Sequence, residues 1–169
     1  MDNQIINRVD ASGLMVLDLE DYYQKGERIV YDIKINLYQD LILKEKDFRE
    51  FLKSHNWDFY TDKFVAITCS VDVIIPTWAY MLLISKITPF ARHVVIGDKV
   101  FLERILILNS LHLIDKNVFK DQRVVVKGCG KLKIDSFAYG EITKVLLPVV
   151  KSVMFGEPCS TVPIYKFKN

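Results

Sequence analysis

Short apolar runs alternate with helix-length segments from residue 64 onward, and this alternation constrains the fold more than any other feature of the sequence. Residues 64–68, 94–96, 124–126 and 153–155 are continuous apolar runs, which are typical of strands buried on both faces of a sheet. Residues 77–88, 98–113 and 136–147 have the length and pattern of helices. This alternation predicts βαβ units and a largely parallel sheet with helices on both faces.

The first 63 residues carry weaker and mixed signals. Residues 14–17 and 28–33 read as short strands, and residues 44–55 as a helix with Phe48, Phe51 and Leu52 on one apolar stripe. We therefore predict a single α/β domain over residues 1–169, in which residues 1–63 form an N-terminal α+β extension.

Two segments of the predicted sheet resemble each other, residues 64–98 and residues 123–157. Seven features recur in the same order: a cysteine after a strand, a hydroxyl residue, an aromatic-Ala-Tyr triplet, a proline, an apolar strand, a glycine and an acid. The order favours an internal structural repeat. Two unrelated βαβ units with similar turn residues are the alternative.

Composition excludes several classes of protein. Half of the 169 residues are hydrophobic and the formal net charge is +2, so the chain is not intrinsically disordered. No basic block or stripe is present, which argues against binding to nucleic acid or to an anionic membrane. The uncharged stretch 73–85 is too short to span a membrane. Three widely spaced cysteines do not form a disulfide framework, and we expect a reduced, cytoplasmic protein.

The three cysteines are the main candidate site. Cys69, Cys129 and Cys159 each follow a predicted strand. Because ligands bind outside the carboxyl ends of strands in open α/β sheets, all three thiols are expected at one edge. Thiolates favour zinc or an iron–sulfur cluster, and a water, a substrate, His93 or a partner's ligand would complete the coordination. The sequence contains no C-x-x-C pair, so the strong signature of a zinc site is absent. The alternative to a metal or cluster site is that all three cysteines are buried and inert.

Other residues near these cysteines are candidates for supporting roles. Asp72 and Lys127 are candidates to assist a reactive thiol, as a base or by lowering its pKa. The residues expected to line the same edge are Ser70, Gly128, Gly130, Glu157 and Ser160. The acidic group 18–21 reads as a solvated loop. No phosphate-binding glycine motif is present, so the sequence indicates no nucleotide site.

Several segments of the chain resemble a small bacterial family catalogued as domain of unknown function 2480. The matching blocks are 11–14 with 18–20, 43–49, 69–70 with 76–81, 127–129, and 155–163, and together they extend over nearly the whole chain. The resemblance transfers no catalytic residue. It implies a genomic association with the sulfur-mobilisation pathway for iron–sulfur assembly. Gly130 stands where the family is expected to have serine, so no hydroxyl role is assigned there.

Three functional hypotheses follow from these observations. The first is an accessory protein that binds a metal or an iron–sulfur cluster and assists cluster assembly or delivery, with iron–sulfur assembly proteins as partners. The second is a thiol-dependent enzyme that acts on a small molecule at the same sheet edge. The third is a structural or interaction domain without chemistry, and a homo-oligomer is compatible with all three.

Overall fold

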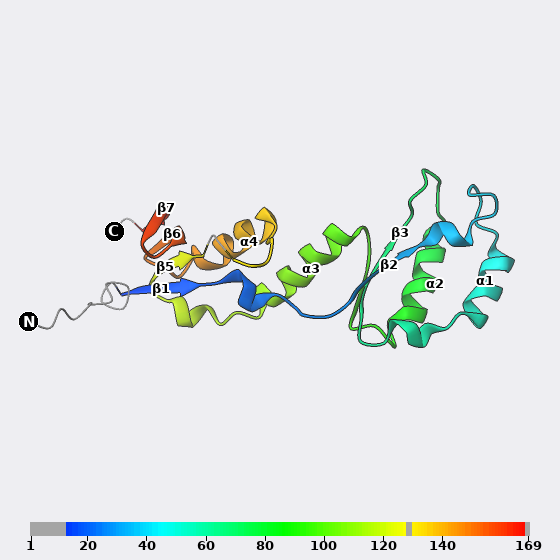
Figure 1. The fold of residues 1–169 in the computed structure, drawn as a ribbon, viewed down its shortest axis with the longest axis horizontal. Helices are drawn as coiled ribbons and strands as arrows, with labels where there is room; N and C mark the ends of the chain where they lie inside the picture. The colour runs from blue at the N-terminus through cyan, green and yellow to red at the C-terminus, as the bar shows by residue number, and fades with distance from the viewer. Residues whose placement is uncertain (1–12, 128–129, 168–169) are drawn as a thin grey trace, which may run out of the picture. The chain divides into compact units, whose positions relative to one another are not determined.

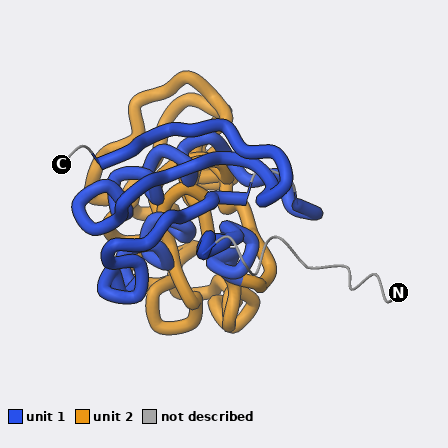
Figure 2. The backbone as a smooth tube through the Cα atoms, turned by 90° about the vertical axis from the view of Figure 1, so that its left-hand side faces the viewer, with its two compact units in different colours: residues 1–24, 106–169 blue, residues 25–105 orange. Residues whose placement is uncertain are grey.

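A computed structural model describes residues 13–127 and 130–167 of the chain. The chain divides into two compact units (Figure 2). Unit 1 comprises Met1–Gln24 and Leu106–Asn169, and unit 2 comprises Lys25–Ile105. Unit 2 is therefore an insertion in the sequence of unit 1.

Unit 2 is built on a three-stranded parallel sheet of order β2-β3-β4 (Figure 1). Its strands are β2 (Arg28–Asp32), β3 (Phe64–Thr68) and β4 (His93–Ile96). The 3-10 turn η3 (Ile33–Asn36), the helix α1 (Glu45–Ser54) and the 3-10 turn η4 (Trp57–Tyr60) connect β2 to β3. The helix α2 (Thr77–Ile87) connects β3 to β4.

Unit 1 contains a four-stranded sheet of order β1-β5-β6-β7. The parallel strands are β1 (Leu14–Leu17), β5 (Arg123–Val126) and β6 (Ser152–Glu157), and β7 (Ser160–Lys166) pairs antiparallel to β6. The turn η2 (Leu19–Tyr22) follows β1, η5 (Lys116–Phe119) precedes β5, and α4 (Ser136–Leu146) connects β5 to β6. The helix α3 (Lys99–His112) contributes its first half to unit 2 and its second half to unit 1.

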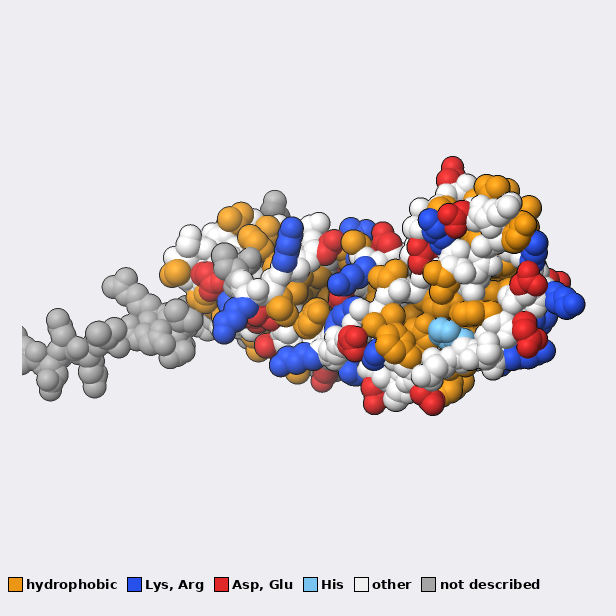
Figure 3. Space-filling view, turned by 45° about the vertical axis from the view of Figure 1, so that its right-hand side comes forward, with side chains coloured by type: hydrophobic (Ala, Val, Ile, Leu, Met, Phe, Trp, Pro, Cys, Tyr) orange, Lys and Arg blue, Asp and Glu red, His pale blue; other side chains and the backbone are white. Residues whose placement is uncertain are grey.

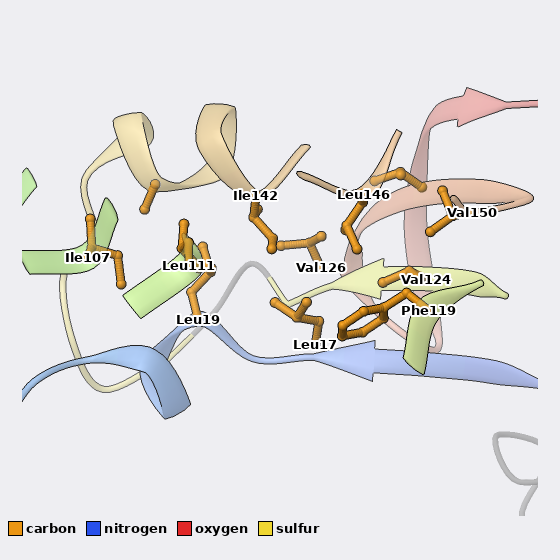
Figure 4. Packing of buried hydrophobic residues seen from close by; sticks show 12 residues of the cluster. Leu17, Leu19, Ile107, Leu111, Phe119, Val124, Val126, Ile142, Leu146 and Val150 are labelled. Carbon is orange, nitrogen blue, oxygen red and sulfur yellow. The ribbon is translucent and has the colours of Figure 1, made fainter. Parts of the chain in front are cut away.

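Each unit has its own hydrophobic core, and the two cores are built from corresponding positions. Residues from α1 onward in unit 2 correspond to residues 59 positions later in unit 1, and those of the first strand and turn to residues 14 positions earlier. Figure 4 shows how the core side chains of unit 1 point toward one another from α3, α4, β1 and β5. The corresponding buried pairs, unit 2 first, are Tyr31/Leu17, Ile33/Leu19, Phe48/Ile107, Leu52/Leu111, Tyr60/Phe119, Val65/Val124, Ile67/Val126, Ala79/Ala138, Leu83/Ile142 and Ile87/Leu146.

The turn before the central strand is also duplicated. Asp62 and Asp121 both have φ of +59°, a left-handed conformation that is unusual for residues other than glycine. The Asp62 N–H donates to the Phe90 carbonyl at 3.1 Å, and the Asp121 N–H donates to the Val149 carbonyl at 2.8 Å. These bonds hold the corresponding loops in the same conformation in both units.

The structure confirms the predicted α/β class, the mostly parallel strands and the two related βαβ units, β3-α2-β4 and β5-α4-β6. It divides the strands between two sheets. The strands of the predicted N-terminal extension lie one in each sheet, β1 beside β5 and β2 beside β3. The assignment of the whole chain to a single domain stays a prediction. Among the described residues, no helix is long and apolar enough to cross a membrane.

Candidate functional site

The duplication separates residues that serve folding from residues that only one unit has. An aspartate stands at the end of the first strand of each unit: Asp18 directly follows β1, and Asp32 is the last residue of β2. Each carboxylate accepts a hydrogen bond from the N–H two residues later, at 3.0 Å from Glu20 and at 3.0 Å from Lys34. This shared bond begins the 3-10 turn, so it is part of the fold rather than of a site.

In unit 2 the aspartate accepts a second hydrogen bond, from the loop that follows β3. The Ser70 N–H donates to Asp32 Oδ1 at 3.1 Å. Burial alone would raise the pKa of Asp32, but the hydrogen bonds from Ser70 and from the Lys34 N–H lower it more, and the net pKa lies below its ordinary value. Asp32 therefore ties the loop after β3 to the turn after β2.

In unit 1 the corresponding aspartate binds a lysine. Lys127 stands where unit 2 has Thr68, and its Nζ lies 2.7 Å from Asp18 Oδ2. The hydrogen bond from Lys127 is the main reason that the pKa of Asp18 lies below its ordinary value. The same bond raises the pKa of Lys127, and the nearby carboxylates of Glu157 and Glu20 raise it further. Lys127 is therefore a protonated lysine among three carboxylates at the carboxyl end of β5.

Glu20 connects the turn η2 to the loop after β5. Its Oε1 accepts a hydrogen bond from the Leu132 N–H at 2.5 Å. Gly130 lies directly beside this carboxylate, and a Cβ at position 130 would overlap Glu20 Oε1. A serine at position 130 would require the flexible Glu20 side chain to move, so this contact does not by itself demand glycine there.

The structure does not place all the cysteines in one sheet. Cys159 is exposed in the turn between β6 and β7 of unit 1, and Ser160 begins β7. Cys69 is partly buried in unit 2, where its Sγ donates to the Val71 carbonyl at 3.3 Å. Gly128 and Cys129 lie outside the described residues, in the segment that follows β5 in unit 1.

Two other candidates, Asp72 and His93, lie in unit 2, whereas Lys127 and Glu157 lie in unit 1. Asp72 is exposed in the loop that follows Cys69. His93 is the first residue of β4, at its amino end, whereas Cys69 follows the carboxyl end of the parallel neighbour β3. The structure therefore does not bring His93 to the edge of the sheet that Cys69 follows.

No preformed metal site is evident in the part of the chain that the structure describes. Within residues 13–127 and 130–167, no group of three or more His, Cys, Asp or Glu side chains is arranged to hold a metal ion. The convergence of three thiolates stays a prediction, because Cys129 lies outside these ranges.

Two residues of the unit 1 edge were not recognised from the sequence, Asp18 and Glu20, which were assigned to a solvated loop. The available signal was a repeated apolar-Asp-apolar pattern, Leu17-Asp18-Leu19 and Tyr31-Asp32-Ile33, in which each aspartate stands at the end of a strand. Pattern alone did not reveal that Asp18 meets a lysine 109 residues later.

A small apolar pocket lies beside α4 in unit 1. Its volume is about 110 Å³, and its lining residues are Val126, Tyr139, Thr143, Val153, Met154, Phe155 and Ile164. The Thr143 hydroxyl donates to the Tyr139 carbonyl at 2.7 Å, so this lining hydroxyl is already engaged. The pocket has the size and character to accept one apolar side chain rather than a metal.

Comparison with known proteins gives one match. A family model described as "Protein of unknown function (DUF2480)" matches residues 3–167. Neither the curated proteins nor the solved structures include a significant match to the chain.

Proposed function

The chain belongs to the DUF2480 family, and we propose that it is an accessory protein that binds a soft metal ion or an iron–sulfur cluster at the carboxyl edge of unit 1. In this proposal the ligands are the thiolates of Cys129 and Cys159, with the carboxylate of Glu157 beside them. The cytoplasm is the proposed location, and iron–sulfur assembly proteins are the proposed partners.

The observation that carries the proposal is the pairing of β5 with β6. These strands are parallel neighbours, with Val126 opposite Phe155, so the segments that follow them leave the same edge of one sheet. Cys129 follows β5 by three residues and Cys159 follows β6 by two. Soft thiolate ligands are those that zinc, copper(I) and iron–sulfur clusters prefer.

The charges at this edge suit a cationic ligand. Asp18, Glu20 and Glu157 provide three carboxylates near the ammonium of Lys127. Carboxylates beside the proposed thiolate ligands attract a metal cation.

The donor set fits a site for transfer better than a site for permanent storage. Two thiolates and one carboxylate leave a four-coordinate metal without its full set of protein ligands. An incomplete set lets a partner protein supply the remaining ligand, which is what delivery of a metal or cluster requires. When bound, the metal or cluster would be cargo, and Lys127 with Asp18 would hold the strand ends together beneath it.

Cys69 has no ligand role in this proposal. It lies in unit 2 and its thiol donates to a backbone carbonyl, so Cys69→Ala is the matched control. The protein would be purified without oxygen as wild type, Cys129→Ala, Cys159→Ala and Cys69→Ala, with visible absorption and iron, zinc and sulfide analysis of each sample.

We expect metal, or broad absorption at about 400 nm with stoichiometric iron and sulfide, in the wild type and in Cys69→Ala. We expect its loss in Cys129→Ala and Cys159→Ala. Loss in Cys69→Ala as well would restore the three-thiolate hypothesis. A metal-free wild type that stays empty after reconstitution with iron and sulfide or with zinc would contradict the proposal.

A thiol-dependent enzyme is the second candidate, and the exposed thiol of Cys159 is the observation that favours it. Lys127 is a poor general base, because its bond to Asp18 stabilises the protonated form. Alkylation of the native protein with iodoacetamide tests this candidate. A Cys159 that reacts no faster than a free cysteine would argue against an activated nucleophile.

A further inference from the structure

One face of α2 in unit 2 carries no charged residue, and the exposed Lys86 of the same helix lies beside that face. Thr77, Met81, Ser85 and Thr88 are exposed at intervals of three or four residues, which places them on one face that continues past the end of the helix. Met81 is 67% exposed, and the neighbouring Trp78 and Leu82 are partly buried. Figure 3 shows that hydrophobic side chains gather on the visible face of unit 2. We call Thr77, Met81, Ser85 and Thr88, with Trp78 and Leu82, the uncharged face of α2.

The hydroxyl groups of Ser85 and Thr88 on this face donate to carbonyls of the helix itself. Ser85 Oγ donates to the Leu82 carbonyl at 2.7 Å, and Thr88 Oγ1 donates to the Ile84 carbonyl at 2.7 Å. Contact with an apolar surface would therefore leave neither the Ser85 hydroxyl nor the Thr88 hydroxyl without an acceptor. Hydroxyl side chains that bond back to their own helix also let a second helix approach closely.

Unit 1 shows what the same position looks like when it faces water. The residues of α4 and the loop after it that correspond to the exposed ones of α2 are Ser136, Gly140, Lys144 and Leu147, and all four are exposed. Glu141, which stands where α2 has Leu82, forms an ion pair with Lys144 at 2.5 Å. The fold therefore accepts a charged pair at this position, and folding alone does not account for the uncharged face of α2.

We propose that the uncharged face of α2 is an interface with α2 of a second copy of this chain, packed antiparallel across a two-fold axis near Met81. The face matches itself under a two-fold rotation, because the small Thr77 and Ser85 lie one helical turn on either side of the long side chain of Met81. An antiparallel pair with its axis near Met81 places the two Met81 side chains beside each other and Thr77 of each copy opposite Ser85 of the other. A contact of this kind closes after two copies.

The charges that flank the face favour the same arrangement. Asp72 precedes the helix and Lys86 lies in its last turn, and both are exposed. Antiparallel packing brings the acidic end of one copy toward the basic end of the other, whereas parallel packing would bring like charges together. This proposal concerns unit 2 and does not depend on metal binding by unit 1.

The test copies the charged pair of α4 into α2. The double variant Leu82→Glu with Ser85→Lys reproduces the Glu141–Lys144 pair at the corresponding positions, so the helix should still form. The full-length wild type and the variant would be compared by sedimentation velocity from about 1 to about 100 µM. Ser54→Lys, a charge added at an exposed position of α1, is the control.

We expect a dimer for the wild type and for Ser54→Lys. We expect at least about a hundredfold weaker association for the double variant, since the introduced ion pair would have to lose its hydration at the interface. Circular dichroism and the urea midpoint of the dissociated protein report whether the variant still folds. A wild type that is monomeric at the highest concentration, or a folded double variant that associates as strongly as the wild type, would overturn the proposal.

A second measurement tests whether residue 81 lies near the two-fold axis. In a background with all three native cysteines changed to alanine, Met81→Cys should form an intermolecular disulfide with a mild oxidant, because residue 81 lies near its own copy. Lys46→Cys, at an exposed position of α1, should not. Equal cross-linking of the two variants would contradict the proposed axis.

Discussion

At the scale of single residues, the aspartates at the ends of the first strands show how one position acquires two uses. Asp18 and Asp32 make the same bond to the N–H two residues later. In unit 2 the second hydrogen-bond donor to the aspartate is the Ser70 N–H, whereas in unit 1 it is the Lys127 ammonium. The backbone bond belongs to the fold, and the second partner distinguishes the two units.

These aspartates should make folding stability depend on acid. The pKa of each lies below its ordinary value in the folded protein, so each stabilises the fold at neutral pH and loses that contribution as the pH falls through its lowered pKa. We expect Asp18→Asn and Asp32→Asn to be less stable than the wild type at pH 7, with the difference shrinking toward about pH 2. Urea midpoints at several pH values measure this. Asp47→Asn, an exposed change on α1, is the control, and a difference that stays constant with pH would contradict the prediction.

His55 should give folding stability a second pH dependence, at higher pH than the dependence caused by the aspartates. Its ring centroid lies 4.5 Å from that of Trp57 and 4.8 Å from that of Phe51, and its Nε2 lies 3.2 Å from the Tyr60 hydroxyl. Burial lowers the pKa of His55. The unfolded chain therefore binds a proton first, and stability present above about pH 6.5 declines as the pH falls through the lowered pKa of the folded state.

The variant His55→Phe should lose this dependence between pH 7 and pH 5. Urea midpoints measured at both values would show a smaller change than in the wild type. An unchanged slope in His55→Phe would assign the titration to another group.

At the scale of elements, the loop before each central strand depends on a left-handed aspartate. Asp62 and Asp121 have φ of +59°. A Cβ destabilises this conformation, so glycine is favoured there over alanine. We expect Asp62→Gly to be more stable than Asp62→Ala by about 1 kcal/mol, and the same ordering at position 121. Urea denaturation of the four variants tests this, and an alanine variant as stable as its glycine counterpart would show that the loop relaxes.

The crossover helices should contribute to the two cores alike. Leu83 on α2 and Ile142 on α4 occupy corresponding positions and are both fully buried. Truncation to alanine leaves a cavity, so we expect Leu83→Ala and Ile142→Ala each to lower the free energy of unfolding by about 2–5 kcal/mol. Met81→Ala, at an exposed position of α2, should cost less than about 1 kcal/mol in the monomeric protein.

At the scale of the whole molecule, the chain contains one structural plan twice, with unit 2 inserted after the first strand and turn of unit 1. The buried residues of the two cores form separate clusters that share no member. The strand β7, which belongs only to unit 1, carries Pro163 and pairs with β6 through an irregularity between Val153 and Met154. Proline and bulges are features that protect an edge strand from further pairing.

Separate cores predict separate local opening. Leu83→Ala should speed native-state hydrogen exchange chiefly at the amides of β3, and Ile142→Ala chiefly at those of β5. Exchange followed by mass spectrometry on peptides from both strands measures this. Equal acceleration of both strands by either variant would show that the two cores open together.

The sequence alone determined the elements whose signals are local. The helices α1, α2, α3 and α4 lie within two residues of their predicted ends, because apolar periodicity, prolines and glycines act over a few residues. The parallel pairing within 64–98 and within 123–157 was also predictable, because a strand-helix-strand unit has one favoured connection. The strand β7 was missed, because Pro163 weakens its local strand signal.

Only the tertiary structure decided which strands share a sheet. Strand pairing depends on hydrogen bonds between residues far apart in the chain, and β1 pairs with β5 across 109 residues. The same long-range pairing places Lys127 against Asp18 and assigns Cys69 and Cys159 to different units. A local pattern shows that a residue follows a strand. It does not show which neighbour that strand will take, and the composition of a site depends on that neighbour.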